Sequence, residues 1–142
     1  MSAILLAILT PAPGRESEFN RWYDDTHAVE ALATPGLASI ARYRMADVLL
    51  FPGIELPAPY ITLYELDDDR PETMQSVAAS LREVFLGGDD TDGRHISEVH
   101  FTDLIDMTNL SACFAVEVAG RRTKAEVLGV AGAAGAGSRA DG

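Results

Sequence analysis

The segment FNRWYDDTHAVEALATPG, Phe19–Gly36, decides the fold of this chain. Its apolar residues recur at helical spacing, which predicts an amphipathic helix over about residues 16–33. Thr34-Pro35-Gly36 predicts the end of that helix, because proline cannot continue it and glycine turns the chain. At about 100° per residue, the stripe expected to seat the helix on a sheet consists of Phe19, Trp22, Val29 and Ala33.

The segments around this helix predict strands and a second helix. Residues 3–10 are apolar at nearly every position, which is typical of a strand covered on both faces. Alternation of apolar and polar residues predicts a second strand over 37–45, and β-branched and aromatic residues predict a third over 60–66. A second amphipathic helix follows residues 67–72, and the pattern then places a fourth strand over residues 98 to about 107.

The predicted order is β-α-β-β-α-β, the ferredoxin-like arrangement of the α+β class. Two helices would cover one face of a four-stranded antiparallel sheet. The other face is also apolar, since Ile61 and Leu63 oppose Tyr60 and Tyr64 along the third strand. A second copy of the same sheet is the economical cover, so we expect a homodimer that packs face to face through its sheets.

Two segments extend this plan. We expect one domain over residues 1–109, followed by a C-terminal extension, 110–142, which holds a candidate extra strand or arm and an Ala/Gly-rich tail. The apolar, proline-broken segment 48–59 is either a lid that closes a cleft and brings Phe51 to a ligand, or a cover for the partner subunit.

Composition excludes several classes of protein. The 142 residues fit one domain, and 22 acidic against 11 basic residues give a net charge of −11, which disfavours nucleic acids and anionic membranes. The single cysteine excludes an internal disulfide. The apolar N-terminal run is short and lacks a basic start, and no apolar stretch approaches the ~20 residues of a membrane span. We therefore expect a cytoplasmic protein that partners neither nucleic acid nor membrane.

One edge of the first helix carries residues suited to proton transfer. Tyr23, His27 and Glu30 are spaced i, i+4, i+7, and Asp24 also lies within reach of His27. A histidine beside a carboxylate has a pKa suited to proton transfer, and a phenol donates a hydrogen bond to a carbonyl or enolate oxygen. The alternative is a hydrogen-bonded rim with no function. Motifs for metals, phosphates and nucleophile elbows are absent, so we expect no metal and no cofactor.

The pattern F-x-x-W-Y-D-x-x-H-x-x-E, followed by Pro-Gly and a strand ending in R-Y-R, resembles the dimeric α/β-barrel superfamily. Its EthD-like and antibiotic-monooxygenase-like branches are the most similar. The resemblance implies a ligand held between helices and sheet in each protomer. It also implies chemistry of the polyketide or aromatic-metabolite kind, although catalytic residues differ among branches, some of which bind haem.

The leading hypothesis is a small cofactor-independent enzyme that acts on an apolar carbonyl- or phenol-bearing metabolite. Proton transfer by His27 would drive cyclisation, dehydration, isomerisation or oxygenation, with Glu30 or Asp24 orienting the imidazole and Tyr23 binding the oxygen. The candidate substrate-binding residues are Trp22, Phe51, Arg42 and His100. Salt bridges to acidic residues are the alternative role for Arg42. A non-catalytic protein that binds a hydrophobic ligand, or a purely structural dimer, remains the alternative function.

Overall fold

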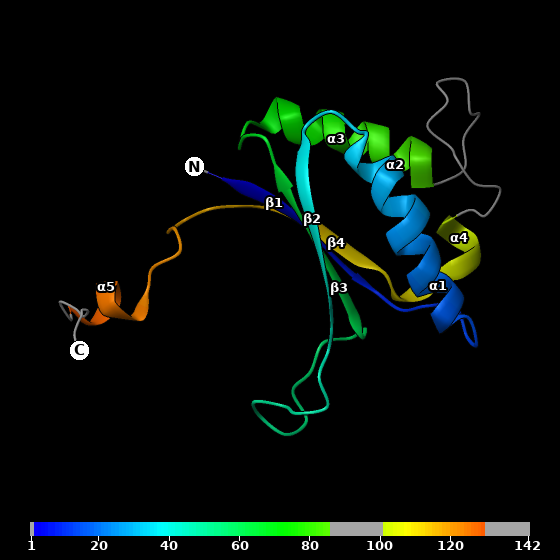
Figure 1. Cartoon of the computed structure of the whole chain (residues 1–142), viewed down its shortest axis with the longest axis horizontal. Helices are drawn as coiled ribbons and strands as arrows, with labels where there is room; N and C mark the ends of the chain where they lie inside the picture. The colour runs from blue at the N-terminus through cyan, green and yellow to red at the C-terminus, as the bar shows by residue number, and fades with distance from the viewer. Residues whose placement is uncertain (1, 86–100, 130–142) are drawn as a thin grey trace.

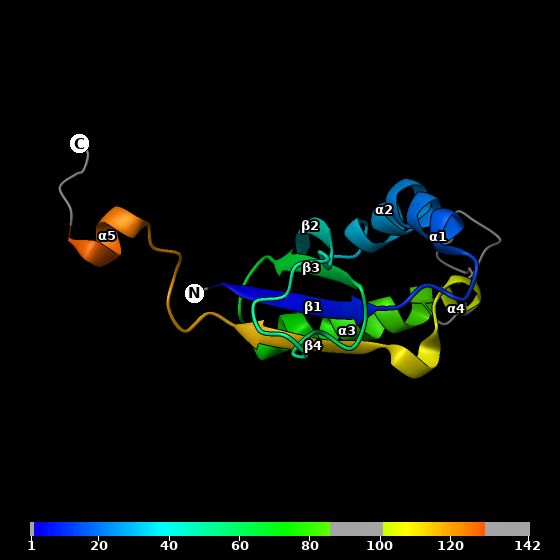
Figure 2. The same ribbon diagram turned by 90° about the horizontal axis from the view of Figure 1, so that it is seen from below.

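The computed structural model describes residues 2–85 and 101–129 (Figure 1). Four strands form one antiparallel sheet in the order β2-β3-β1-β4, with helices α1, α2 and α3 on one side of it (Figures 1 and 2). The expected ferredoxin-like α+β fold is therefore confirmed. The elements are β1 Ala3–Leu9, α1 Glu16–Trp22, the π-helical turn η1 Tyr23–His27, α2 Ala28–Leu32, β2 Leu37–Arg44, β3 Tyr60–Leu66, α3 Pro71–Phe85, α4 Phe101–Leu104, the 3-10 turn η2 Met107–Asn109, β4 Ser111–Val116 and α5 Lys124–Leu128.

The fourth strand was predicted at the wrong place. Where the pattern placed it, the described residues form α4 and η2, and β4 begins only at Ser111, where it pairs along β1. The Asp106 side chain accepts hydrogen bonds from the Thr108 backbone and hydroxyl, and this local bonding competes with strand pairing. The boundary expected after residue 109 therefore precedes the last strand of the sheet.

A β-bulge at the start of β2 turns Leu37 toward the helices. The pairing register between β2 and β3 shifts between Leu37 and Ser39, so that Leu37 pairs with Leu66. In a regular strand Leu37 would lie on the same side as Ala41, four residues on, but the extra residue of the bulge moves it to the helix face. Leu37 is buried there, so the bulge adds one side chain to the core.

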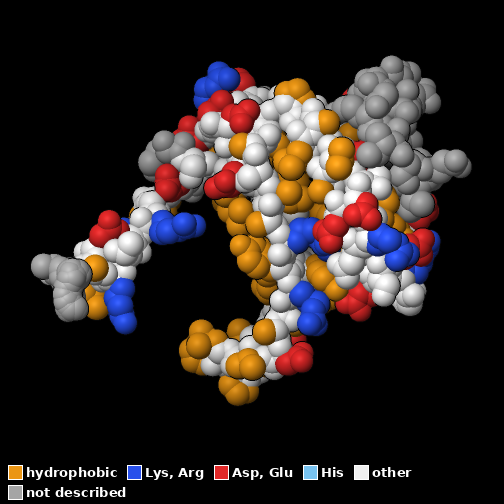
Figure 3. All heavy atoms as spheres, in the orientation of Figure 1, with side chains coloured by type: hydrophobic (Ala, Val, Ile, Leu, Met, Phe, Trp, Pro, Cys, Tyr) orange, Lys and Arg blue, Asp and Glu red, His pale blue; other side chains and the backbone are white. Residues whose placement is uncertain are grey.

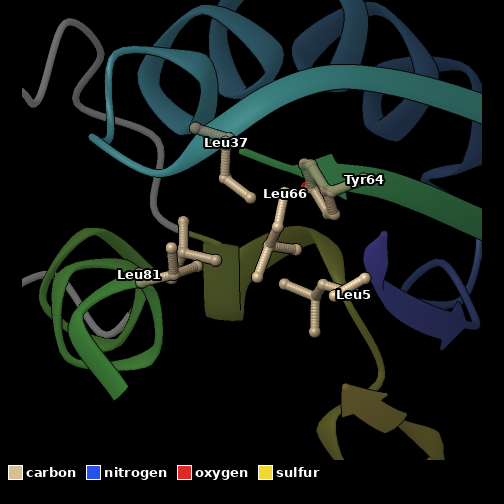
Figure 4. Close-up of a cluster of buried hydrophobic side chains, with 8 residues drawn as sticks. Leu5, Leu37, Tyr64, Leu66 and Leu81 are labelled. Carbon is tan, nitrogen blue, oxygen red and sulfur yellow. The ribbon is translucent and has the colours of Figure 1, made fainter. Parts of the chain in front are cut away.

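The core lies between the sheet and α3. Leu5, Leu37, Leu66 and Leu81 converge there with Tyr64, as Figure 4 shows.

Gly36 joins α2 to β2 with φ +103°, and a Cβ there would lie 2.7 Å from Val77 Cγ2 of α3. Both the backbone angle and the close approach require glycine. The predicted Pro-Gly helix stop is therefore also the point at which the first helix–strand connection packs against α3.

The sheet face opposite the helices is apolar, and no helix or strand of residues 2–85 and 101–129 covers it. Strand alternation places Leu6 and Ile8 of β1 and Ile61 and Leu63 of β3 on that face, where all four are half-exposed. Figure 3 shows hydrophobic side chains gathered in the hollow between the projecting segment 45–59 and the C-terminal segment. Within the described residues, no helix is long and apolar enough to cross a membrane.

Candidate functional site

The helix that carries the candidate residues contains a π-helical turn. Segments α1, η1 and α2 run continuously, and the Ala28 N–H donates to the Tyr23 carbonyl, an i to i+5 hydrogen bond. Such a turn holds one residue more than an α-helical turn and frequently marks a functional site. The extra residue shifts the phase of everything that follows it.

This phase shift corrects the expected stripe. Val29 and Ala33 were predicted to be buried, but both are exposed, and the buried positions are their next neighbours, Glu30 and Thr34. Phe19 and Trp22, which precede the π turn, are buried as expected. Each buried position after the turn is displaced by one residue because one turn holds an extra residue.

The π turn also buries His27 completely, with 0% of its surface exposed. The imidazole stacks on the Trp22 ring, with centroids 4.7 Å apart and planes inclined by 15°. Residues five apart lie on different sides of an α-helix, but the π register brings them together. The edge of the Tyr23 ring lies 4.7 Å from the imidazole on another side.

His27 and Glu30 form a buried acid–base pair. The Glu30 carboxylate is 4% exposed, and its Oε1 lies 3.9 Å from His27 Nδ1, an ion-pair distance longer than a hydrogen bond. Burial lowers the pKa of His27 below its ordinary value of 6.5, although the nearby Glu30 carboxylate acts in the opposite direction. His27 is therefore neutral at pH 7, and a neutral imidazole is the form that accepts a proton.

Two tyrosine hydroxyls meet at the helix–sheet boundary. Tyr23 Oη of η1 lies 3.1 Å from Tyr64 Oη of β3, and both side chains are 1% exposed. Burial raises the pKa of Tyr23 and raises that of Tyr64 further, where the proximity of Tyr23 adds to the effect. Both phenols stay protonated at pH 7. Since one hydroxyl donates to the other, the second retains a proton that it can donate elsewhere.

Arg42 of β2 fixes the outer side of this tyrosine pair. Its guanidinium lies 4.3 Å from the Tyr23 ring centroid, donates to Asp24 Oδ1 at 2.6 Å and donates to Asn20 Oδ1 at 2.7 Å. Asp24 is thus engaged with Arg42, and the structure does not bring it to His27. The salt-bridge alternative for Arg42 is confirmed, and the residue orients Tyr23 by a cation–π contact.

A cavity of about 170 Å³ opens between the sheet, η1 and α3. Its described lining is apolar apart from the two tyrosines and Arg82 of α3. The residues in its wall are Leu5, Ala7, Leu9, Tyr23, Tyr64, Ala78, Leu81, Arg82, Leu110, Ala112 and Phe114. His27, Glu30 and Trp22 are not among them: Trp22 and His27 pack against the Tyr23 ring, and Glu30 lies behind His27.

Two other candidates lie away from the cavity or outside the described residues. Phe51 is 59% exposed on the segment between β2 and β3, which projects away from the helix layer (Figure 1). His100 lies outside the residues that the structure describes. Among the described residues, no group of three or more metal-ligating side chains comes together.

Sequence reasoning missed the second tyrosine and the cavity arginine. Tyr64 alternates with Leu63 and Glu65 along β3, a pattern that assigns it to one face without indicating a partner on the helix. Arg82 occurs in the expected second helix, but only the fold shows that its turn of α3 borders the cavity. The alternation along β3 places Tyr64 on the sheet face that meets the helix carrying Tyr23, and this combination could have predicted that the two phenols meet.

Comparisons with known proteins identify the fold. No protein-family model matches the sequence, and no curated protein sequence is significantly similar to it. Among solved structures, an ethyl tert-butyl ether D (EthD) family protein from Bacillus halodurans C-125 superposes with a TM-score of 0.51 at 19% identity, covering 83% of this chain and all of that one. HapK from Hahella chejuensis superposes with a TM-score of 0.49 at 10% identity, covering 87% and 99% of the two chains. A dimeric ferredoxin-like protein of unknown function from Jannaschia sp. CCS1 gives 0.47 at 10% identity, covering 82% and 100%.

Proposed function

We propose that the cavity of this chain, whose fold is similar to that of an EthD family protein, binds a small apolar molecule carrying a carbonyl or phenol oxygen. The observation that carries this proposal is the Tyr23–Tyr64 hydroxyl pair in the wall of an otherwise apolar cavity. Ligand sites are typically apolar with a few convergent polar groups that fix orientation. The pair supplies one hydrogen bond that remains for a ligand oxygen.

The size of the cavity limits the ligand. An engineered protein cavity of about 150 Å³ binds benzene, so a volume of about 170 Å³ encloses one aromatic ring and a short substituent. A larger molecule fits only if the rest of it extends through the opening. The proposed ligand is therefore a single-ring compound, or the terminal ring of a longer one.

The chemistry that suits this arrangement begins at an enolisable carbonyl. A phenol that donates to the carbonyl oxygen stabilises the negative charge developing there when a proton leaves the neighbouring carbon. Neutral His27, which packs against the Tyr23 ring behind the cavity wall and pairs with Glu30, is the proposed proton acceptor, and this step requires a movement of Tyr23 that brings the imidazole to the ligand. Cyclisation, dehydration and isomerisation of such a molecule can each begin at this enolate, and so can oxygenation, in which O2 enters as co-substrate and is the oxidant.

A specific observation favours the second candidate function, a non-catalytic binding protein. His27 does not line the cavity, and no described residue that lines it is a carboxylate or an imidazole. In that case, the tyrosine pair would bind and orient a ligand that is released without chemical change.

Phenylacetone and isobutylbenzene test the binding site, because they share a ring and a shape but only the ketone has an oxygen. We expect the ketone to bind more tightly, and Ala78→Leu to block both because Ala78 lies in the cavity wall. Ala79→Leu, an exposed position on the same helix, is the matched control. If phenylacetone binds equally well to Ala78→Leu and Ala79→Leu, the ligand lies outside this cavity and the proposal is refuted.

Hydrogen–deuterium exchange at the carbons beside the phenylacetone carbonyl distinguishes the two functions without the native substrate. Each exchange breaks one C–H bond and forms one C–D bond through the enolate. An enzyme accelerates the exchange, and Tyr23→Phe or His27→Gln slows it. Tight binding without acceleration identifies the binding protein.

We also propose that a second copy of this chain covers the free sheet face. Leu6, Ile8, Ile61 and Leu63 lie there, and exposed Tyr43 of β2 extends the same surface. A contiguous apolar face of a sheet is costly to leave in water and marks an interaction site. Light scattering that gives the mass of two chains supports the dimer, and the mass of one chain at high micromolar concentration contradicts it.

A further inference from the structure

Arg82 stands apart from the rest of the cavity. It lies on α3, and it is the only residue with a formal charge among the described residues that line the cavity. Its side chain is exposed, whereas Leu81 beside it in the cavity wall is buried. An arginine at such a border lays its apolar stem along the wall and keeps its guanidinium near the opening.

The surroundings of Arg82 leave its charge unpaired within the described part of the chain. Three other arginines, Arg15, Arg42 and Arg70, each form an ion pair with an acidic side chain. Arg82 forms none there, in a chain with twice as many acidic as basic residues. One turn earlier on the same face of α3 are Ala78 and Ala79, which offer no carboxylate.

A cation at the border of an apolar cavity complements a particular ligand. The ring of the ligand occupies the apolar interior, and an anionic group at the end of a short chain meets the guanidinium, whose planar fork matches a carboxylate. A neutral ligand of the same shape gains nothing from this contact. The charge of the ligand then also fixes which end of it enters first.

We propose that Arg82 makes this cavity selective for small aromatic acids, with the ring inside and the carboxylate on Arg82. This inference rests on the proposed binding function and adds the class of ligand to it. Arg82 is then a specificity-determining residue, in a different part of the wall from the tyrosine pair.

Hydrocinnamate and hydrocinnamyl alcohol test the proposal, because they share a ring and chain length and differ in charge. Their dissociation constants are measured by NMR titration of the full chain, and displacement by phenylacetone confirms that they share its site. We expect the acid to bind about two- to fivefold more tightly than the alcohol, the range for a partly exposed ion pair. The preference falls at about 0.5 M salt, because salt screens exposed charges.

Three variants separate the contact from general electrostatics. Arg82→Met keeps the apolar stem and is expected to abolish the preference for the acid, and Arg82→Lys is expected to retain part of it. Arg21→Met is the matched control, because it changes the net charge equally at an exposed position on α1 outside the cavity wall.

Each outcome decides between the claims. If Arg82→Met keeps the preference, or Arg21→Met removes it equally, the role of Arg82 is refuted while the binding site stands. If the wild-type chain binds acid and alcohol equally, the proposed ligand class is wrong. If neither compound displaces phenylacetone, the proposed selectivity for aromatic acids is also refuted. If phenylacetone itself does not bind, the proposed binding function is refuted instead.

Discussion

Removing the hydroxyls of Tyr23 and Tyr64, singly and together, tests whether the two act as a pair. Each Tyr→Phe change deletes one oxygen and leaves the ring in place, so packing is conserved. The hydroxyls lie 3.1 Å apart at 1% exposure, where an unsatisfied polar group costs about 1–3 kcal/mol. The double variant removes both oxygens and leaves neither one stranded.

The two single variants are expected to differ. Tyr23→Phe strands the Tyr64 hydroxyl, which bonds only to Tyr23 among the residues described, and we expect a loss of about 2 kcal/mol in the free energy of unfolding. After Tyr64→Phe, the buried Thr62 hydroxyl, which has no hydrogen-bond partner among the described residues, can take the place of the lost phenol beside Tyr23, so we expect a smaller loss of about 1 kcal/mol. The double variant then costs about 1–2 kcal/mol, less than the sum of the single losses.

Urea unfolding followed by fluorescence measures these free energies. The chain has a single tryptophan, Trp22, which is buried and packs against Tyr23, so its emission reports on this region. A coupling energy near 1–2 kcal/mol confirms the pair. Strictly additive losses would show that the hydroxyls act independently and would refute the reasoning behind the site.

Three further predictions concern the π turn, the buried histidine and the free sheet face. Deletion of Asp25 is expected to convert the π turn to α-helix without unfolding the chain. Deletion of Ala79, the control, shifts the buried positions of α3 out of phase and is expected to unfold the chain. Urea unfolding followed by circular dichroism measures the stability of both variants. Burial lowers the pKa of His27 below 6.5 in the folded state, so between pH 6.5 and that lower pKa only the unfolded state takes up the proton, and the free energy of unfolding falls as the pH drops. His27→Gln is expected to remove this pH dependence in urea titrations at several pH values. An unchanged dependence in the variant would contradict the assignment to His27. Leu63→Glu places a charge on the free sheet face and is expected to yield monomers by light scattering, and a retained dimer mass would place the interface elsewhere.

The element order was readable from the sequence because apolar periodicity and Pro/Gly stops are local signals. The fourth strand was not, since the chain between α3 and β4 contains apolar residues that the fold uses in a short helix, and only pairing with β1 selects Ser111–Val116. Strand pairing is a long-range property, so a local pattern does not determine which of two similar segments joins the sheet.

The proximity of the candidate residues was predictable from the sequence, but their geometry was not, and their role in a functional site stays a prediction. Tyr23, His27 and Glu30 come together as the i, i+4, i+7 spacing suggested, yet a π turn rather than a regular helix places them. A helical wheel assumes a constant rotation per residue and takes no account of the extra residue in the π turn. It therefore predicted that Val29 is buried and that His27 lies at the edge of the buried stripe.

The position of a bound ketone tests the central claim most directly. A structure of the chain with phenylacetone, or intermolecular NOEs in solution, locates the ring and the oxygen. The account predicts the ring between α3 and the sheet, near Ala78 and Phe114, with the carbonyl oxygen within hydrogen-bonding distance of the Tyr23 or Tyr64 hydroxyl. A ketone bound on the uncovered face of the sheet, with the tyrosine pair untouched, would contradict it.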